Sequence, residues 1–203
     1  MKDLTTTAKK LDRILEIAHI VFGALAIASV VGIALIAVAY ILKLDPEFIG
    51  TGYENFDIGF VELEVAASYA PDKWLVLGQA AFTLLISCRL FYDGRRGIGY
   101  VREILKPMIE EKPFDAIVST NLNKLAKLSI NLGILWNIMI LAEQIMTVFV
   151  FGLPDLLICE KIPHITATFQ VDLTFLICWA AFLLLSYVFR YGEQLQKLSD
   201  ETL

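Results

Sequence analysis

The chain has 203 residues, of which 57% are hydrophobic and 19% are charged, and its net charge is −5. Its mean hydropathy of +0.66 excludes an ordinary water-soluble domain, because a soluble protein of this size would not need several long apolar runs separated by short polar segments. The polar segments hold only 13 to 35 residues each. None of them is long enough to form a soluble domain with a core of its own.

Four long apolar runs determine the predicted fold. They cover residues 14–42, 74–92, 128–152 and 171–189. Each reaches the roughly 18–20 residues that a helix needs to cross about 30 Å of hydrocarbon. Because backbone amides in lipid have no water to bind, such runs must be helical. We therefore expect an all-α membrane protein, a single domain over residues 1–203 with four transmembrane helices.

The basic residues predict how the chain is oriented. Of its 17 Lys and Arg residues, 14 lie in the N-terminal segment, in residues 93–127, in residues 190–203 or at Arg89. Positive charge near the ends of spans marks the cytoplasmic side of a membrane. We therefore expect cytoplasmic N and C termini, a cytoplasmic loop at residues 93–127 and a cytoplasmic tail at residues 190–203. The outer loops are then residues 43–73 and 153–170.

The predicted outer loops contain patterns typical of strands. Apolar and acidic side chains alternate over residues 61–65, and residues 166–169 are also compatible with a strand. These patterns predict a small extracytoplasmic β cap that joins the two loops. The seven acidic residues of the first loop have two interpretations. They are either simply tolerated on the outer side, or they attract a cationic ligand such as a basic peptide or a metal ion.

The predicted cytoplasmic loop begins with a glycine-rich basic sequence at residues 93–99, which we interpret as a tight turn at the membrane surface. Residues 101–109 then carry the spacing of an amphipathic helix. Its apolar face would lie along the inner headgroups or contact a partner. We expect Pro113 to end this helix and Asp115 to cap the next one, which runs into the third span.

The third span carries the polar side chains Asn137, Glu143 and Gln144. An ionisable group within a membrane is costly and usually faces a cavity, a partner or another helix. These residues form a candidate intramembrane polar site, either for a proton or cation or for a ligand at bilayer level. The alternative is that Glu143 lies near the outer end of its span, where it is wetted or hydrogen-bonded to neighbours.

Two features of the first span concern packing. Ala24, Ala28 and Gly32 fall at every fourth residue, which gives a stripe of small side chains that lets another helix approach closely. His19 lies near the expected inner surface, where we interpret it as a hydrogen-bonded interfacial residue rather than a metal ligand or a pH sensor.

Motifs of the common enzyme classes do not occur in the sequence. It contains no His-Glu-x-x-His, no Gly-x-Ser-x-Gly and no Cys-x-x-Cys, the patterns of zinc proteases, serine hydrolases and thiol redox proteins. We therefore expect a non-enzymatic protein with no catalytic residue, no cofactor and no bound metal.

Two stretches on the expected cytoplasmic side carry a family resemblance. One is Lys112-Pro-Phe-Asp before the third span, and the other is the tail, Gly192-Glu-Gln-Leu-Gln followed by Asp200-Glu-Thr-Leu. Together they resemble a family of bacterial four-span membrane proteins classed only as a domain of unknown function. The resemblance implies a protein of the bacterial cytoplasmic membrane. Because members of that family are often encoded beside a small helix-turn-helix regulator, it also implies that such a regulator is held or released at the membrane.

Our first hypothesis is therefore a protein that senses a signal and sequesters a cytoplasmic helix-turn-helix transcription factor without binding nucleic acid itself. The expected docking residues lie in the two resembling stretches. They are Lys112, Pro113, Phe114, Asp115, Gly192, Leu195, Gln196, Asp200 and Glu201.

Two alternative functions remain open. One is a small transporter or channel subunit that uses Asn137, Glu143 and Gln144. Four spans are few for a carrier of the alternating-access type, and a homo-oligomer would overcome this limit. The other is a structural subunit of a larger membrane complex, packed through the small side chains of the first span.

Overall fold

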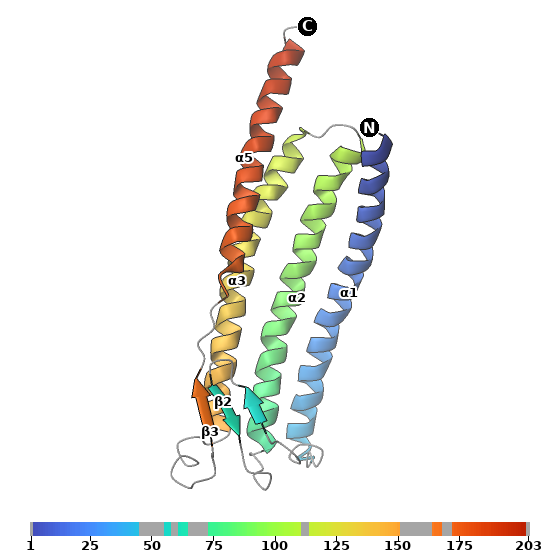
Figure 1. Cartoon of the computed structure of the whole chain (residues 1–203). Helices are drawn as coiled ribbons and strands as arrows, with labels where there is room; N and C mark the ends of the chain where they lie inside the picture. Colours follow the sequence, from blue (N-terminus) through green and yellow to red (C-terminus); the bar gives the residue numbers. More distant parts are fainter. Residues whose placement is uncertain are drawn as a thin grey trace. The chain divides into compact units, whose positions relative to one another are not determined.

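The computed structural model describes residues 2–44, 55–57, 61–64, 73–110, 114–150, 164–167 and 172–201. Four long helices make up most of these residues (Figure 1). They are α1 (Lys2–Ile41), α2 (Lys73–Ile109), α3 (Ala116–Val150) and α5 (Thr174–Glu201).

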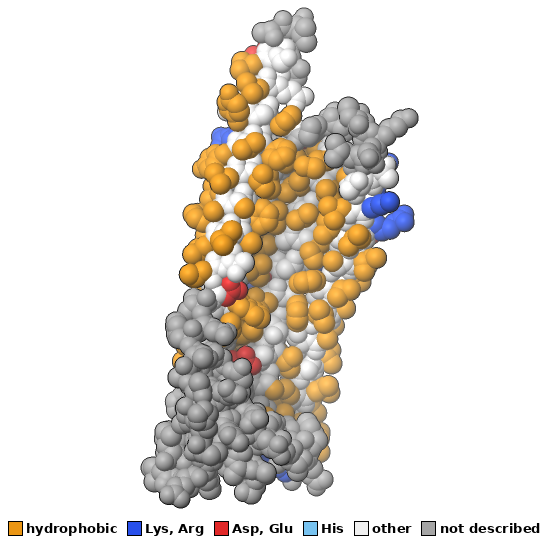
Figure 2. Space-filling model, viewed as in Figure 1, with side chains coloured by type: hydrophobic (Ala, Val, Ile, Leu, Met, Phe, Trp, Pro, Cys, Tyr) orange, Lys and Arg blue, Asp and Glu red, His pale blue; other side chains and the backbone are white. Residues whose placement is uncertain are grey.

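All four helices are long and apolar enough to cross a membrane, which confirms the prediction of a four-span membrane protein. The shortest has 28 residues, or about 42 Å at a rise of about 1.5 Å per residue, so each helix is longer than about 30 Å of hydrocarbon. Apolar side chains cover much of the described helix surface on the face shown in Figure 2. Ile177 and Leu184 on α5, for example, are 73% and 67% exposed, as expected for side chains that face lipid.

The prediction of a turn at residues 93–99 is wrong, because these residues lie within α2. The glycines serve close packing between helices instead. A Cβ atom on Gly94 would lie 2.6 Å from Phe22 of α1, and one on Gly97 would lie 3.1 Å from Leu128 of α3. Helices that approach this closely need glycine at the contact. The predicted amphipathic helix over residues 101–109 is likewise the last part of α2 rather than a separate element.

The predicted start of the next helix is confirmed at Asp115. Its Oδ1 accepts a hydrogen bond of 2.8 Å from the backbone N–H of Ile117, one residue after α3 begins. An aspartate in this position satisfies one of the backbone N–H groups that the first turn leaves without an intrahelical partner. Pro113, which we expected to end the preceding helix, lies outside the described residues.

The chain divides into two compact units, of which unit 1 comprises Met1–Ala26, Arg89–Ile134 and Leu173–Leu203. Its core is formed by buried apolar side chains of α2 and α3, with α5 packed against them. These side chains are Ile104, Val118, Leu122 and Leu125, and partly buried Phe182 and Phe189 of α5 contact them. The ranges of unit 1 hold 14 basic and 11 acidic residues, a net charge of +3.

Unit 2 comprises Ile27–Cys88 and Leu135–Asp172, and its described residues include three short strands. These are β1 (Asn55–Asp57), β2 (Val61–Glu64) and β3 (His164–Ala167), which pair antiparallel in the order β1-β2-β3. Strands β2 and β3 overlap the two segments in which the sequence pattern favoured strands, and Leu63 pairs with Ile165.

Helices α1 and α2 also approach closely within unit 2. A Cβ atom on Gly32 would lie 2.9 Å from Leu84, so the last residue of the small stripe packs against a helix of the same chain. The rings of Tyr40 and Trp74 meet edge to face at 5.3 Å. The ranges of unit 2 hold 3 basic and 11 acidic residues, a net charge of −8.

Candidate functional site

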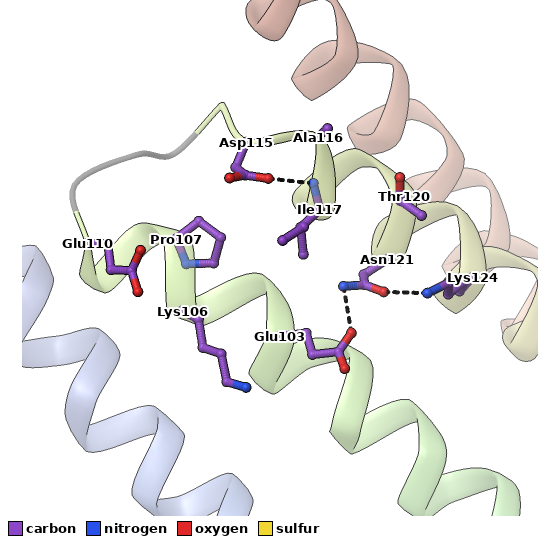
Figure 3. Close-up of a pocket in the computed structure, with 10 residues that line it drawn as sticks. All are labelled: Glu103, Lys106, Pro107, Glu110, Asp115, Ala116, Ile117, Thr120, Asn121 and Lys124. Atoms are coloured by element: carbon purple, nitrogen blue, oxygen red, sulfur yellow. Dashed lines mark hydrogen bonds between the residues drawn. The ribbon is translucent and has the colours of Figure 1, made fainter.

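A polar cavity of about 550 Å³ lies in unit 1, between the last turns of α2 and the first turns of α3 (Figure 3). Seven of the ten residues that line it are charged or polar. The lining residues are Glu103, Lys106, Pro107, Glu110, Asp115, Ala116, Ile117, Thr120, Asn121 and Lys124.

Asn121 links the two helices beside this cavity. It is only 1% exposed, and both ends of its amide are used. Its Nδ2 donates a hydrogen bond of 2.9 Å to Glu103 Oε2 of α2, and its Oδ1 accepts one of 3.1 Å from Lys124 Nζ (Figure 3). A buried amide without partners would be strongly unfavourable. The bond to Glu103 joins α3 to α2, whereas the bond from Lys124 lies within α3.

Polar contacts continue from Lys124 along α2. Lys124 Nζ lies 5.3 Å from the centre of the Tyr100 ring, and the Tyr100 hydroxyl accepts a hydrogen bond of 3.1 Å from Arg96 Nη2. Arg96 also contacts Asp93, whose side chain is only 4% exposed. Asp93 Oδ2 lies 2.9 Å from Arg89 Nε, and Asp93 Oδ1 lies 3.6 Å from Arg96 Nη1.

This Arg89–Asp93–Arg96 cluster was not predicted, because residues 93–99 were expected to form a turn. The spacing of three and four residues between opposite charges was the signal that could have revealed it, since such pairs meet on one face of a helix. The buried Asp93 also has a physical consequence. A carboxylate shielded from water requires positive partners, and the two arginines supply them.

A second set of polar contacts, also in unit 1, joins α1 to α2. Arg102 Nε lies 2.8 Å from Asp12 Oδ1, and Arg102 Nη2 lies 3.8 Å from Glu16. Arg95 Nε donates a hydrogen bond of 3.2 Å to His19 Nε2, which agrees with the interpretation of His19 as a hydrogen-bonded residue. The sequence pattern contained no indication of the Asp12 pair, because its members are 90 residues apart.

The structure brings together the two stretches that we expected to form a docking surface. The Phe114 ring occupies the space that a side chain at Gly192 of α5 would need, and it lies 5.9 Å from the ring of Phe189. Phe114 is still 41% exposed. Lys112 lies outside the described residues, as does Pro113.

The end of α5 continues beyond this contact. Nine residues separate Gly192 from Glu201, which corresponds to about 13 Å of helix, and Figure 1 shows these turns continuing past the start of α3. Large apolar side chains remain exposed there: Leu195 is 50% exposed and Leu198 is 59% exposed. Gln196 and Glu201 are exposed too, whereas the side chain of Asp200 is outside the described set.

Of the three residues of the candidate intramembrane polar site, Asn137 has a structural role. Asn137 Nδ2 donates a hydrogen bond of 3.0 Å to the Asp172 carbonyl, and the Asp172 N–H donates one of 3.2 Å to Asn137 Oδ1. Asn137 thus satisfies the backbone just before α5 begins at Thr174. Glu143 is half-buried, and the side chain of Gln144 is outside the described set. A shared intramembrane site of these three residues therefore stays a prediction.

The comparisons with known proteins give no match, either to a family model, to a curated protein or to a solved structure. The chain is therefore assigned to no family. Among the described residues, no group of three or more His, Cys, Asp or Glu side chains could hold a metal ion.

Proposed function

We propose that this is a non-enzymatic protein of the bacterial cytoplasmic membrane, with both termini in the cytoplasm, that senses a signal and sequesters a helix-turn-helix transcription factor. The docking surface is formed by Phe114 and by the face of α5 that carries Tyr191, Leu195 and Leu198. The contact between Phe114 and Gly192 carries the proposal, because it joins the two stretches in which the family resemblance lies into one surface.

The three apolar side chains of α5 are spaced by four and three residues, so they share one face of the helix. They are 63%, 50% and 59% exposed. The last turns of α5 extend past the start of α3 (Figure 1). An apolar helix face of this kind fits a groove on a partner protein.

Charge favours a basic partner at this surface. Residues 191–203 carry three acidic residues and one basic residue, a net charge of −2, and Lys197 is already paired with Glu193 at 2.7 Å. Glu201 remains at the tip of α5. A DNA-binding protein presents a basic face, which the acidic end of α5 would complement electrostatically.

The signal is expected to act on unit 2, whose net charge of −8 favours a cationic ligand over an anionic one. This assignment follows from charge alone. The docking surface lies in unit 1, so it can be tested independently of the signal.

The test is crosslinking in native membranes, followed by purification of the tagged full-length protein and mass spectrometry of what is attached. We expect a small helix-turn-helix protein with the wild type. Leu195→Asp places a charge on the docking surface and should weaken the affinity for the partner about tenfold, which is about 1.4 kcal/mol. Much less of the helix-turn-helix protein should then be recovered with this variant.

Gln194→Asp is the matched control, since it adds the same charge at an exposed neighbouring position that points about 100° away around the helix. Recovery should be unchanged in this variant. Equal recovery by wild type and Leu195→Asp would overturn the proposed surface. Crosslinks only to membrane subunits, or only between copies of this chain, would instead favour the transporter or structural hypothesis.

A further inference from the structure

Two exposed arginines on one face of α2 play no part in the docking surface. Arg89, Tyr92 and Arg96 are separated by three and four residues, so they lie on one stripe of the helix. We propose that Arg89 and Arg96 together bind the phosphate of an anionic phospholipid headgroup, with Tyr92 between them.

The buried Asp93 holds both arginines in position. It lies 2.9 Å from Arg89 Nε and 3.6 Å from Arg96 Nη1. One carboxylate cannot neutralise two guanidinium groups, so the cluster keeps a net positive charge. Each guanidinium carries five N–H donors, which is more than the contacts with Asp93 and the hydrogen bond from Arg96 to the Tyr100 hydroxyl use.

The side chains of Arg89 and Arg96 are exposed although Asp93 and Tyr92 contact both of them. The side chains of Arg89 and Arg96 are 58% and 48% exposed, and their guanidinium carbons lie 5.9 and 6.0 Å from the centre of the Tyr92 ring. A guanidinium is a planar fork of N–H donors that matches the oxygens of a phosphate. Because the carboxylate and the ring already restrict both side chains, less conformational entropy is lost when a phosphate binds.

The position of the cluster along the chain favours a lipid over a soluble phosphate. The fifteen residues from Trp74 to Cys88 contain no charged side chain, and they correspond to about 22 Å of helix. This is less than the roughly 30 Å of hydrocarbon. The uncharged stretch by itself therefore ends short of the headgroups, and the long side chain of Arg89 extends to the boundary between hydrocarbon and headgroups, where lipid phosphates lie and where tyrosine is enriched.

Native mass spectrometry of the full-length protein in a non-ionic detergent tests this site. The protein is titrated with dioleoyl phosphatidylglycerol and, separately, with dioleoyl phosphatidylcholine in ammonium acetate of physiological ionic strength. Wild type should bind the anionic lipid more tightly. R89Q/R96Q should lower that affinity about tenfold and leave the affinity for phosphatidylcholine unchanged.

The matched control is K9Q/K10Q, which removes the same charge from exposed positions on α1. At this ionic strength, charges farther than about 8 Å from the lipid are largely screened, so its affinity should fall by at most about twofold. Equal losses in the two double variants would overturn the site, as would equal wild-type affinity for the two lipids. Displacement of the lipid by an equal concentration of inorganic phosphate would overturn the assignment to a lipid headgroup.

R89K/R96K keeps the proposal testable if R89Q/R96Q does not fold. Lysine preserves the charge that Asp93 requires but lacks the planar fork, so the affinity for phosphatidylglycerol should fall about threefold. Unchanged affinity in R89K/R96K would show that paired guanidinium groups do not bind the headgroup.

Discussion

The glycines of the helices differ in what surrounds them. Gly94 and Gly97 of α2 and Gly192 of α5 each face a side chain of a neighbouring helix or connection, whereas a Cβ atom on Gly99 would have no such neighbour within 4 Å. A glycine in a helix lowers stability by about 0.5–1 kcal/mol relative to alanine. It is favourable where it permits close packing, and only the three-dimensional contacts reveal which glycines do so.

Gly192→Ala should therefore lower the free energy of unfolding by about 1 kcal/mol, because its methyl group would overlap the Phe114 ring and displace it. Gly99→Ala is the matched control and should raise the free energy of unfolding by up to about 1 kcal/mol. Titration of the detergent-solubilised protein with SDS, followed by circular dichroism, measures both changes. If the two variants shift stability in the same direction, the contact between Phe114 and Gly192 is not formed.

Asp115 is a second position at which one side chain has a local effect. Asp115→Ala removes the hydrogen bond to the Ile117 N–H and should lower the free energy of unfolding by about 1 kcal/mol. Asp115→Asn keeps an acceptor at the same place and should change stability by no more than a few tenths of a kcal/mol. The same SDS titration compares the variants, and equal losses in both would argue that the charge of Asp115, not the cap, matters.

At the scale of the element, the continuity of α2 is the main departure from the sequence analysis. Three glycines and two arginines within residues 93–99 are typical of a turn, and helix propensity alone disfavours these glycines. The tertiary contacts outweigh this preference. Gly94 and Gly97 lie against α1 and α3 respectively, and Asp93 pairs with arginines one turn before and one turn after it.

Gly99→Pro tests that continuity. Within a helix, proline removes a backbone hydrogen bond and clashes with the preceding turn, so the free energy of unfolding should fall by about 3 kcal/mol. In a turn, proline would be tolerated. The environment of Gly99 is open, so a large effect cannot come from side-chain overlap, and Gly99→Ala serves again as the control. If the free energy of unfolding falls by less than about 1 kcal/mol, residues 93–99 form a turn rather than a helix.

At the scale of the whole molecule, charge is divided between the two units. Unit 1 has a net charge of +3 and unit 2 a net charge of −8. The two sets of residues alternate along the chain, because each of α1, α2 and α3 contributes to both units. Of the 17 basic residues, 14 lie in unit 1 and 3 in unit 2, and from the positive-inside rule we expect unit 1 on the cytoplasmic side.

Topology can be measured with fusion proteins. Green fluorescent protein fused after Leu203 should fluoresce, because we expect the C terminus in the cytoplasm, and alkaline phosphatase at the same point should be inactive. Alkaline phosphatase inserted after Lys43 should be active. The opposite pattern would place unit 1 outside and would remove the basis for a cytoplasmic partner.

Most of the spans could be predicted because hydropathy acts locally: an apolar run of sufficient length has to be helical in lipid, whatever its neighbours are. The cap at Asp115 was predictable for the same reason, since it depends on residues two positions apart. Phe114 and Gly192 were each named from sequence as candidate docking residues, and that role stays a prediction. Their contact was not predicted, because it joins positions 78 residues apart.

The amino-acid order was sufficient to establish that this protein has four apolar helices and that its positive charges are gathered in a few segments, because both properties are sums over neighbouring residues. Three-dimensional packing was needed to establish that residues 93–99 stay helical, that Asp93 is buried between two arginines and that Asn121 joins Glu103 to Lys124. These outcomes depend on which helices pack together. Local propensity, at less than about 1 kcal/mol per residue, is too weak to oppose such packing.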